Sequence, residues 1–423
     1  MKFKFYYVVL IIFLAVGLSG FGQSLSLQYC WDKSRENYPL NNVSIDIIQK
    51  ATGQKLKNIN SSWYPQFALG AQASWQSDVP HVDIDNPMFD FPIAPKDQYK
   101  AFIDINQIIY DGGFTRKNKE LVNAQGGAQK QDVETKLREV KSRVTDIYFS
   151  LLILREQKQQ LVILIEDLDA RVREINSAVK NGVVHITELS MLELEKMNAE
   201  KQYVTLALSE KSLFDILSLY TGTDISINQE LETPDEDLFA VPQIRPELTA
   251  FALQQEQFKV RQELSKVAVL PKLAAFAQGG YGNPALNMLK DEFAPFYVVG
   301  LRLQWQPWDW KTTSRNKKVF ALESDLAEQH ENSFIREMQR THFQINGELE
   351  QYKQKMEKDS VIVSKHRQIV SNYQIRLKNG AITSADYIAV INAASRAQLE
   401  MEVNRLQYLH MLARQYLVGF GAK

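Results

Sequence analysis

One segment of this sequence occurs twice. Residues 99–119, YKAFIDINQIIYDGGFTRKNK, return as residues 297–317, YVVGLRLQWQPWDWKTTSRNK, at a spacing of 198 positions. The tetrapeptide VKNG at residues 179–182 returns as LKNG at residues 377–380 with the same spacing. Such a fixed period indicates two copies of one structural unit. The 423 residues are therefore explained by one unit of roughly 200 residues in duplicate, which leaves no length for a separate catalytic domain.

The N-terminus has the pattern of a cleaved signal peptide. Lys2 and Lys4 precede an apolar run at residues 5–18, and Gly20 and Gly22 follow it. The run is too short to span a bilayer as a helix. We therefore predict four parts along the chain: a signal peptide at residues 1–22, a first repeat at 23–230, a linker at 231–246 rich in Asp, Glu and Pro, and a second repeat at 247–423.

Charge and cysteine content exclude several kinds of protein. The net charge is −1 with 23% charged residues, which provides no basic field for nucleic acid. No later segment has 18 uninterrupted apolar residues, so we predict no transmembrane helix, whereas transmembrane strands remain possible because averaging hides their alternation. Cys30 is the only cysteine and has no internal disulfide partner. We expect it to be a small buried residue on the first helix.

Four segments alternate between apolar and polar residues, which predicts strands at residues 67–75, 99–106, 273–281 and 297–306. In the last of these, Leu301 and Leu303 lie on one side, and Arg302 and Gln304 lie on the other. The third segment is the weakest because Phe276 falls on its polar side. We predict that strand from the repeat and not from its own pattern.

Aromatic residues cluster at the ends of these strands, as they do in membrane barrels, where they sit at headgroup level. For one isolated strand, a soluble half-buried sheet would be the default interpretation; the signal peptide and the helical context favour a membrane sheet. Four strands cannot close a barrel, since about eight are needed. Two copies of the chain would supply eight strands and three would supply twelve, and counting alone does not choose between them.

The pattern then changes to a heptad. Apolar residues alternate four and three positions apart over residues 133–179, interrupted by Lys158, and again over residues 335–377, interrupted by His342, Asp359 and His366. A repeat of 3.5 residues predicts long helices packed as a coiled coil. An Asn-Gly pair ends each long helix and a second apolar pattern follows it, so residues 181–182 and 379–380 are predicted to be the tips of two helical hairpins. A purely structural antiparallel coiled coil is the simpler alternative.

The sequence offers little for catalysis. The six histidines form no metal-ligand spacing, no glycine-rich phosphate loop follows a strand, and Cys30 has no evident base partner. We therefore predict a protein that is not an enzyme and needs no metal or cofactor.

Over essentially the whole mature chain, the sequence resembles the TolC family of outer-membrane efflux proteins. The matching segments appear in the family's order: LSL and NYP in residues 25–39, WYPQ at 63–66, DGG at 111–113, RPEL at 245–248, VLPK at 269–272, and Asn-Gly at both tips. The resemblance implies a mainly α fold with membrane β structure, assembled as a homotrimer. Each chain would contribute four strands to a 12-stranded β-barrel and four helices to a 12-helix α-barrel tunnel.

The resemblance also implies where partners bind. Gly182, Val183, Gly380 and Ala381 match the positions at the two tips that dock a periplasmic adaptor, the membrane fusion protein. Just beyond the two turns, Glu188 and Asp386 match acidic positions that narrow the lumen of the tunnel in this family. An alternative for both acids is stabilisation of the helix dipole from the first turn, worth about 0.3 to 1 kcal/mol each.

The second tip departs from the best-known members of the family. A tyrosine and an arginine form a latch there in those members, whereas this chain has Leu377 and Ile382. A latch built on these two positions is therefore not expected. How the tip is held closed is left open by the sequence.

The predicted function is passive conduction across the outer membrane of a Gram-negative bacterium. Solute would pass from an inner-membrane transporter and its adaptor through the periplasmic tunnel and the lipid-embedded barrel, as in tripartite efflux or type I secretion. A periplasmic coiled-coil scaffold, or the adaptor itself, is the alternative, and it leaves the aromatic-flanked strands unexplained. The sequence does not identify the exported solute.

Overall fold

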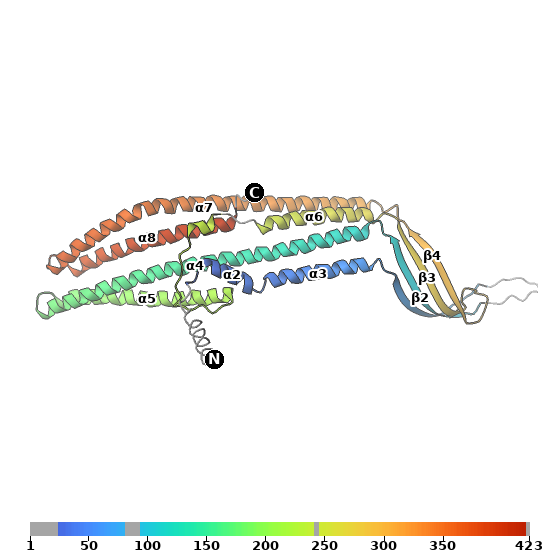
Figure 1. Ribbon diagram of the computed structural model, residues 1–423, viewed down its shortest axis with the longest axis horizontal. Coiled ribbons are helices and arrows are strands. Elements are labelled where there is room, and N and C mark those ends of the chain that lie inside the picture. The colour runs from blue at the N-terminus through green and yellow to red at the C-terminus, as the bar shows by residue number, and fades with distance from the viewer. Residues whose placement is uncertain (1–23, 81–93, 241–244, 420–423) are drawn as a thin grey trace, which may run out of the picture. The chain divides into compact units, whose positions relative to one another are not determined.

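The computed structural model describes residues 24–80, 94–240 and 245–419 (Figure 1). The predicted signal peptide lies outside these residues. The helices are α2 (Leu27–Asn37), α3 (Asn42–Ser61), α4 (Phe114–Lys180), α5 (Ile186–Thr221), α6 (Pro246–Val267), α7 (Thr312–Lys378) and α8 (Ser384–Val418), with a short 3₁₀ helix η1 (Glu236–Phe239). The strands are β1 (Gln66–Trp75), β2 (Asp97–Tyr110), β3 (Lys272–Asn283) and β4 (Ala294–Gln304). The order of helix, two strands and long helical hairpin therefore occurs twice, as the duplication predicted.

The chain forms two compact units. Among the described residues, one unit contains those up to Ser44 together with those within Val133–Pro246 and Ser333–Lys423, and the other contains those within Ile45–Asp132 and Glu247–Asn332. Each unit combines parts of both copies of the repeat. The repeat boundaries predicted from the sequence do not coincide with the boundaries of these units. They remain a prediction about the duplication.

The first unit is built from two hairpins, α4 with α5 and α7 with α8. Its larger core joins residues of α2, α4, α5, α8 and η1, and the fully buried side chains of Tyr148 and Phe149 lie at its centre. Tyr148 Oη lies 2.5 Å from the carbonyl oxygen of Leu25 and 2.6 Å from that of Glu232. The backbone at Leu25 and the backbone at Glu232 are thereby fastened to α4.

Cys30 is fully buried on α2, as predicted. Burial raises the pKa of its thiol to about 12, because the charged thiolate is disfavoured away from water. The thiol is thus held in its neutral form in this core.

Polar residues that interrupt the two heptads form contacts within the hairpins. Lys158 of α4 and Arg155 both pair with the carboxylate of Glu210 on α5, which is 2% exposed. In the second hairpin, Asn404 of α8 donates to Asp359 of α7 at 2.9 Å. A single buried polar pair of this kind fixes the register of two packed helices.

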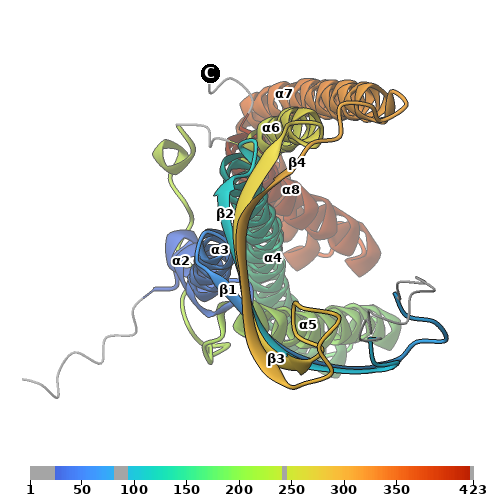
Figure 2. The same cartoon turned by 90° about the vertical axis from the view of Figure 1, so that its right-hand side faces the viewer.

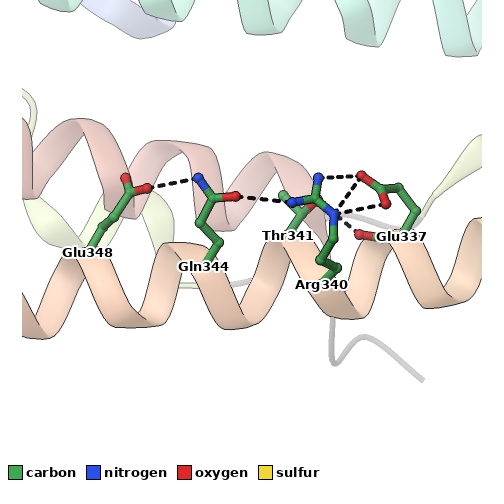
Figure 3. Close-up of polar contacts among 5 residues, drawn as sticks. All are labelled: Glu337, Arg340, Thr341, Gln344 and Glu348. Atoms are coloured by element: carbon green, nitrogen blue, oxygen red, sulfur yellow. Dashed lines mark hydrogen bonds and ion pairs between the residues drawn. The ribbon is translucent and has the colours of Figure 1, made fainter.

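The exposed surface of α7 carries a second type of polar contact (Figure 3). The Arg340 guanidinium bonds the carboxylate of Glu337 and the side-chain oxygen of Gln344, and Gln344 in turn donates to Glu348 at 3.0 Å. All of these residues stand three or four positions apart on one helix. Such pairs stabilise a helix by about 0.2 to 0.5 kcal/mol each, so this row supports α7 itself.

The second unit contains a four-stranded antiparallel sheet in the order β1-β2-β3-β4. Figure 2 shows these strands side by side in a strongly curved sheet. Because β2 pairs with β3, the two copies of the repeat meet in the middle of the sheet. β1 and β4 are left as its two edges.

Exposure alternates along much of β2 and β4, as the period of two predicted, but not along β1 and β3. On β4, the alternate residues Tyr297, Val299, Leu301 and Leu303 are 67–76% exposed. On the opposite face, Phe296, Val298 and Gly300 are partly buried, so this face is more enclosed over that part of β4.

Phe276 is explained by its neighbours on that more enclosed face. It lies opposite Gly300 on β4, and an atom added at Gly300 would come within 2.9 Å of its ring. The Arg302 guanidinium lies 5.0 Å from the ring centre, within the range of a cation–π contact. The aromatic residue that weakened the strand prediction therefore occupies the space left by a glycine.

In the part of the chain that the structure describes, no helix combines the length and the apolar content needed to cross a bilayer.

Candidate functional site: the paired hairpin tips

Both long helices end in the same turn. After α4, the Gly182 N–H bonds the carbonyl of Val179 at 3.0 Å and the Val183 N–H bonds that of Ala178 at 3.0 Å. After α7, Gly380 and Ala381 repeat the pattern with the carbonyls of Leu377 and Arg376, each at 2.9 Å. These paired bonds define a Schellman motif, which satisfies the last carbonyls of a helix. The Asn-Gly pairs in the sequence correctly predicted the positions of both tips.

Glycine is required at each tip by the backbone and not by crowding. The φ angles are +69° at Gly182 and +67° at Gly380, in the left-handed region that favours glycine. A Cβ added at either position would meet no heavy atom within 4 Å. Val183 is 76% exposed and Ala381 is exposed as well. The structure therefore puts all four predicted docking residues on open turns, two at each tip.

The second tip begins its return helix with a complete capping box. Thr383 Oγ1 accepts a hydrogen bond from the Asp386 N–H at 3.2 Å, and the Asp386 carboxylate accepts from the Thr383 N–H at 3.1 Å. The hydrogen bonds from Thr383 hold the pKa of Asp386 below its usual value. Asp386 is exposed. Its geometry matches the alternative of an acid that stabilises the start of a helix, and its carboxylate is charged at neutral pH.

The first tip begins its return helix differently. His185 is the N-cap of α5, and its Nδ1 accepts from the Thr187 N–H at 3.3 Å. Glu188 reaches the other hairpin, where its carboxylate accepts from the backbone N–H of Ser384 at 2.7 Å. The two acids that the sequence placed in equivalent positions therefore have different partners.

The positions that depart from the known latch lie in an apolar cluster. Leu377 is 8% exposed, and Ile382 packs against the same group of side chains from α4, α5, α7 and α8. Apolar packing thus takes the place of polar side chains at these two residues. The cluster also contains Tyr387, whose side chain is fully buried.

Two further polar contacts join the hairpins, and the sequence analysis did not identify them. Tyr387 Oη donates to Asp167 of α4 at 2.8 Å, and Asn392 donates to Glu195 of α5 at 2.7 Å. Burial, followed by the hydrogen bond to Asp167, raises the pKa of Tyr387. One signal was available in the sequence, since a tyrosine at a core position of a heptad needs a partner for its hydroxyl. The identity of that partner depends on packing between hairpins.

The arrangement offers exposed turns to which a partner could bind. Among the described residues, no three His, Cys, Asp or Glu side chains are grouped so that they could hold a metal ion. The polar side chains of His185, Glu188, Thr383 and Asp386 are engaged in helix caps and in a contact between the hairpins. What the tips present outward is two exposed turns on a packed four-helix base.

Comparison with solved structures shows the fold of this chain. It matches the outer membrane protein VceC of Vibrio cholerae with a TM-score of 0.70 at 12% identity, over 94% of this chain and 97% of that one. It matches the Campylobacter jejuni CmeC outer membrane channel with a TM-score of 0.66 at 16% identity, over 93% and 86%. The open state of the Neisseria gonorrhoeae MtrE outer membrane channel gives a TM-score of 0.68 at 15% identity, over 94% and 89%.

No protein-family model matches the sequence, and no curated protein matches it significantly. The structural likeness nevertheless extends over almost the full length of both chains in each pair. The chain therefore has the fold of outer-membrane channels, as the TolC-family resemblance implied. The mainly α fold with two strands and one long hairpin in each repeat is confirmed.

Proposed function

We propose that this chain forms the outer-membrane channel of a tripartite efflux or type I secretion system in a Gram-negative bacterium. The observation that carries the proposal is the likeness to outer-membrane channels over nearly the whole chain, including the sheet and both hairpins. Solute moves passively through the channel, and energy is supplied by a transporter in the inner membrane. The test is conductance, because the purified protein is expected to form open pores or gated pores in planar bilayers. Absence of any channel activity across a range of voltages would count strongly against it.

The sheet supports the assembly of several copies of the chain. Each chain supplies four strands with two free edges, and a closed barrel removes such edges. Three copies bring together twelve strands and the twelve helices of their hairpins, four from each chain. The family resemblance favours this homotrimer over a dimer. The mass of the detergent-extracted protein tests this, and a stable monomer would contradict it.

The tips are the proposed contact with the periplasmic adaptor. Gly182, Val183, Gly380 and Ala381 are supported in this role by their exposure on matching turns. Site-specific photo-cross-linking from Val183 and Ala381 in the native host tests it. A partner that cross-links only to the side of the hairpins would locate the contact elsewhere.

The acids are the proposed constriction of the lumen. Three copies of Asp386 in a trimer would form a ring of exposed carboxylates, and such a ring favours cations. Glu188 is proposed for the same ring. Its carboxylate also accepts a hydrogen bond from the backbone N–H of Ser384. Ion selectivity measured in planar bilayers is the test.

A periplasmic scaffold or adaptor is the second candidate. It accounts for the hairpins but not for the apolar side chains that are 67–76% exposed along β4, since soluble proteins rarely expose contiguous apolar patches of this kind. Membrane fractionation separates the two, because a scaffold would be released with the periplasm.

A further inference from the structure

The two tips carry the same acidic position in different chemical roles. Glu188 and Asp386 stand 198 positions apart, and each is the third residue of its return helix. Asp386 bonds Thr383 on its own helix, whereas Glu188 bonds the first backbone N–H of α8, that of Ser384. The acid of the first copy therefore caps the helix of the second copy.

The contact is one that water cannot readily replace. The first N–H groups of a helix have no acceptor within that helix, and Ser384 is only 1% exposed. A buried N–H without an acceptor is unfavourable. In addition, the carboxylate of Glu188 lies at the positive end of the α8 dipole, where a negative charge is stabilising. Both effects hold the first turn of α8 against α5.

A second contact repeats this one along the same two helices. Glu195 follows Glu188 by seven positions on α5, and Asn392 follows Ser384 by eight on α8, which is about two helical turns on each. Asn392 donates to Glu195 at 2.7 Å. The helices α5 and α8 therefore leave their tips in register, with polar contacts at both ends of this segment.

We propose that Glu188 is a positioning residue that joins the two tips into one docking surface. It fixes the start of α8, and hence the turn at Gly380 and Ala381, relative to the first hairpin. The adaptor then meets two tips whose relative positions are set before it binds. This role rests on the proposed docking of an adaptor at the tips, but the mechanical link between the hairpins does not.

The link is tested on the purified full-length protein by hydrogen–deuterium exchange. In Glu188→Ala we expect the amides in the first turn of α8 to exchange about tenfold faster or more, the effect of losing a hydrogen bond to a charged group. Glu188→Gln keeps an oxygen acceptor and is expected to retain most of the protection. The matched control is Asp386→Ala, which removes the capping box of α8 and is expected to leave exchange in α5 unchanged.

The outcome that overturns the link is specific. If Glu188→Ala accelerated exchange only in the first turn of α5 and left α8 unchanged, Glu188 would serve its own helix alone. Equal loss of protection in Glu188→Gln and Glu188→Ala would also overturn it, because the retained acceptor would then have no effect.

Docking is tested separately by photo-cross-linking in the native host. With Glu188 present, probes at Val183 and Ala381 are expected to capture the same partner; in Glu188→Ala the Ala381 cross-link is expected to be lost while the protein still forms its assembly. Absence of a cross-link from both tips, together with the expected exchange result, would contradict adaptor docking and leave the link intact.

Discussion

Arginine at position 301 gives the sharpest test of where the sheet lies. Leu301 is on β4, opposite Ala275 on β3, and its side chain is 68% exposed in the single chain. The substitution therefore disturbs few contacts within the protein. Any large effect on stability must come from what surrounds the sheet, either lipid or water.

Lipid and water predict different losses of folding stability for this substitution. An arginine facing lipid near the middle of the bilayer costs about 2 to 4 kcal/mol, whereas a substitution on a water-exposed surface changes stability by only about 0.5 kcal/mol in either direction. The control is Gln304→Arg, three residues later on the more polar side. Gln304 lies opposite Lys272, and like charges across strands add a penalty of up to about 1 kcal/mol.

The assay is folding of the two variants into lipid vesicles, followed by urea titration of the folded fraction. We expect Leu301→Arg to lower the free energy of unfolding by about 2 to 4 kcal/mol per chain and Gln304→Arg by about 1 kcal/mol or less. Equal losses in both variants would refute the assignment of faces. No loss in either would refute a lipid-embedded sheet altogether.

Three further predictions concern the tips and the helical core. Gly380→Val, and likewise Gly182→Val, is expected to strain the turn by about 1 to 2 kcal/mol and abolish export, with normal trimer yield; normal cross-linking to the adaptor in these variants would argue against docking there. Asp386→Ala is expected to reduce cation selectivity in planar bilayers, and unchanged selectivity would leave this carboxylate a helix cap only. Burial alone would raise the pKa of Glu210, but hydrogen bonds from Lys158 and Arg155 outweigh burial and lower it. The contribution of the Glu210 carboxylate to folding stability is therefore present above about pH 4.5. It is lost as the pH falls through the lower folded-state pKa. Glu210→Gln is thus expected to destabilise the protein by about 2 kcal/mol at pH 7, and urea titrations that showed the same deficit at pH 3 would contradict this ionic role.

Local rules were sufficient for the presence of the elements and for both hairpin turns, but less so for the strand ends: β2 continues to Tyr110, beyond the predicted end at residue 106. A period of two located three of the strands, and the repeat located the fourth. The Asn-Gly pairs located both Schellman turns, because a left-handed turn selects for glycine whatever surrounds it. Polar residues within the heptads were also visible. Their partners, Glu210 for Lys158 and Asn404 for Asp359, were not, because they depend on how far one helix slides along another.

The duplication was a guide to position but not to partner. It placed Glu188 and Asp386 at equivalent sites, yet their neighbours had already diverged: the N-cap is His185 in one copy and Thr383 in the other. A threonine hydroxyl completes a capping box with the acid three residues on, whereas the histidine caps through its ring nitrogen. The longer side chain of Glu188 is then free to reach the other hairpin.

This divergence has a consequence for the assembled channel. If three chains assemble, six tips form the end of the tunnel, and they are of two kinds that alternate around the ring. One kind carries its acid in its own helix cap, and the other extends its acid to the neighbouring hairpin of the same chain. An adaptor that contacts both kinds therefore meets three linked pairs of tips and not six independent ones, so the pair is the unit on which a substitution at either tip acts.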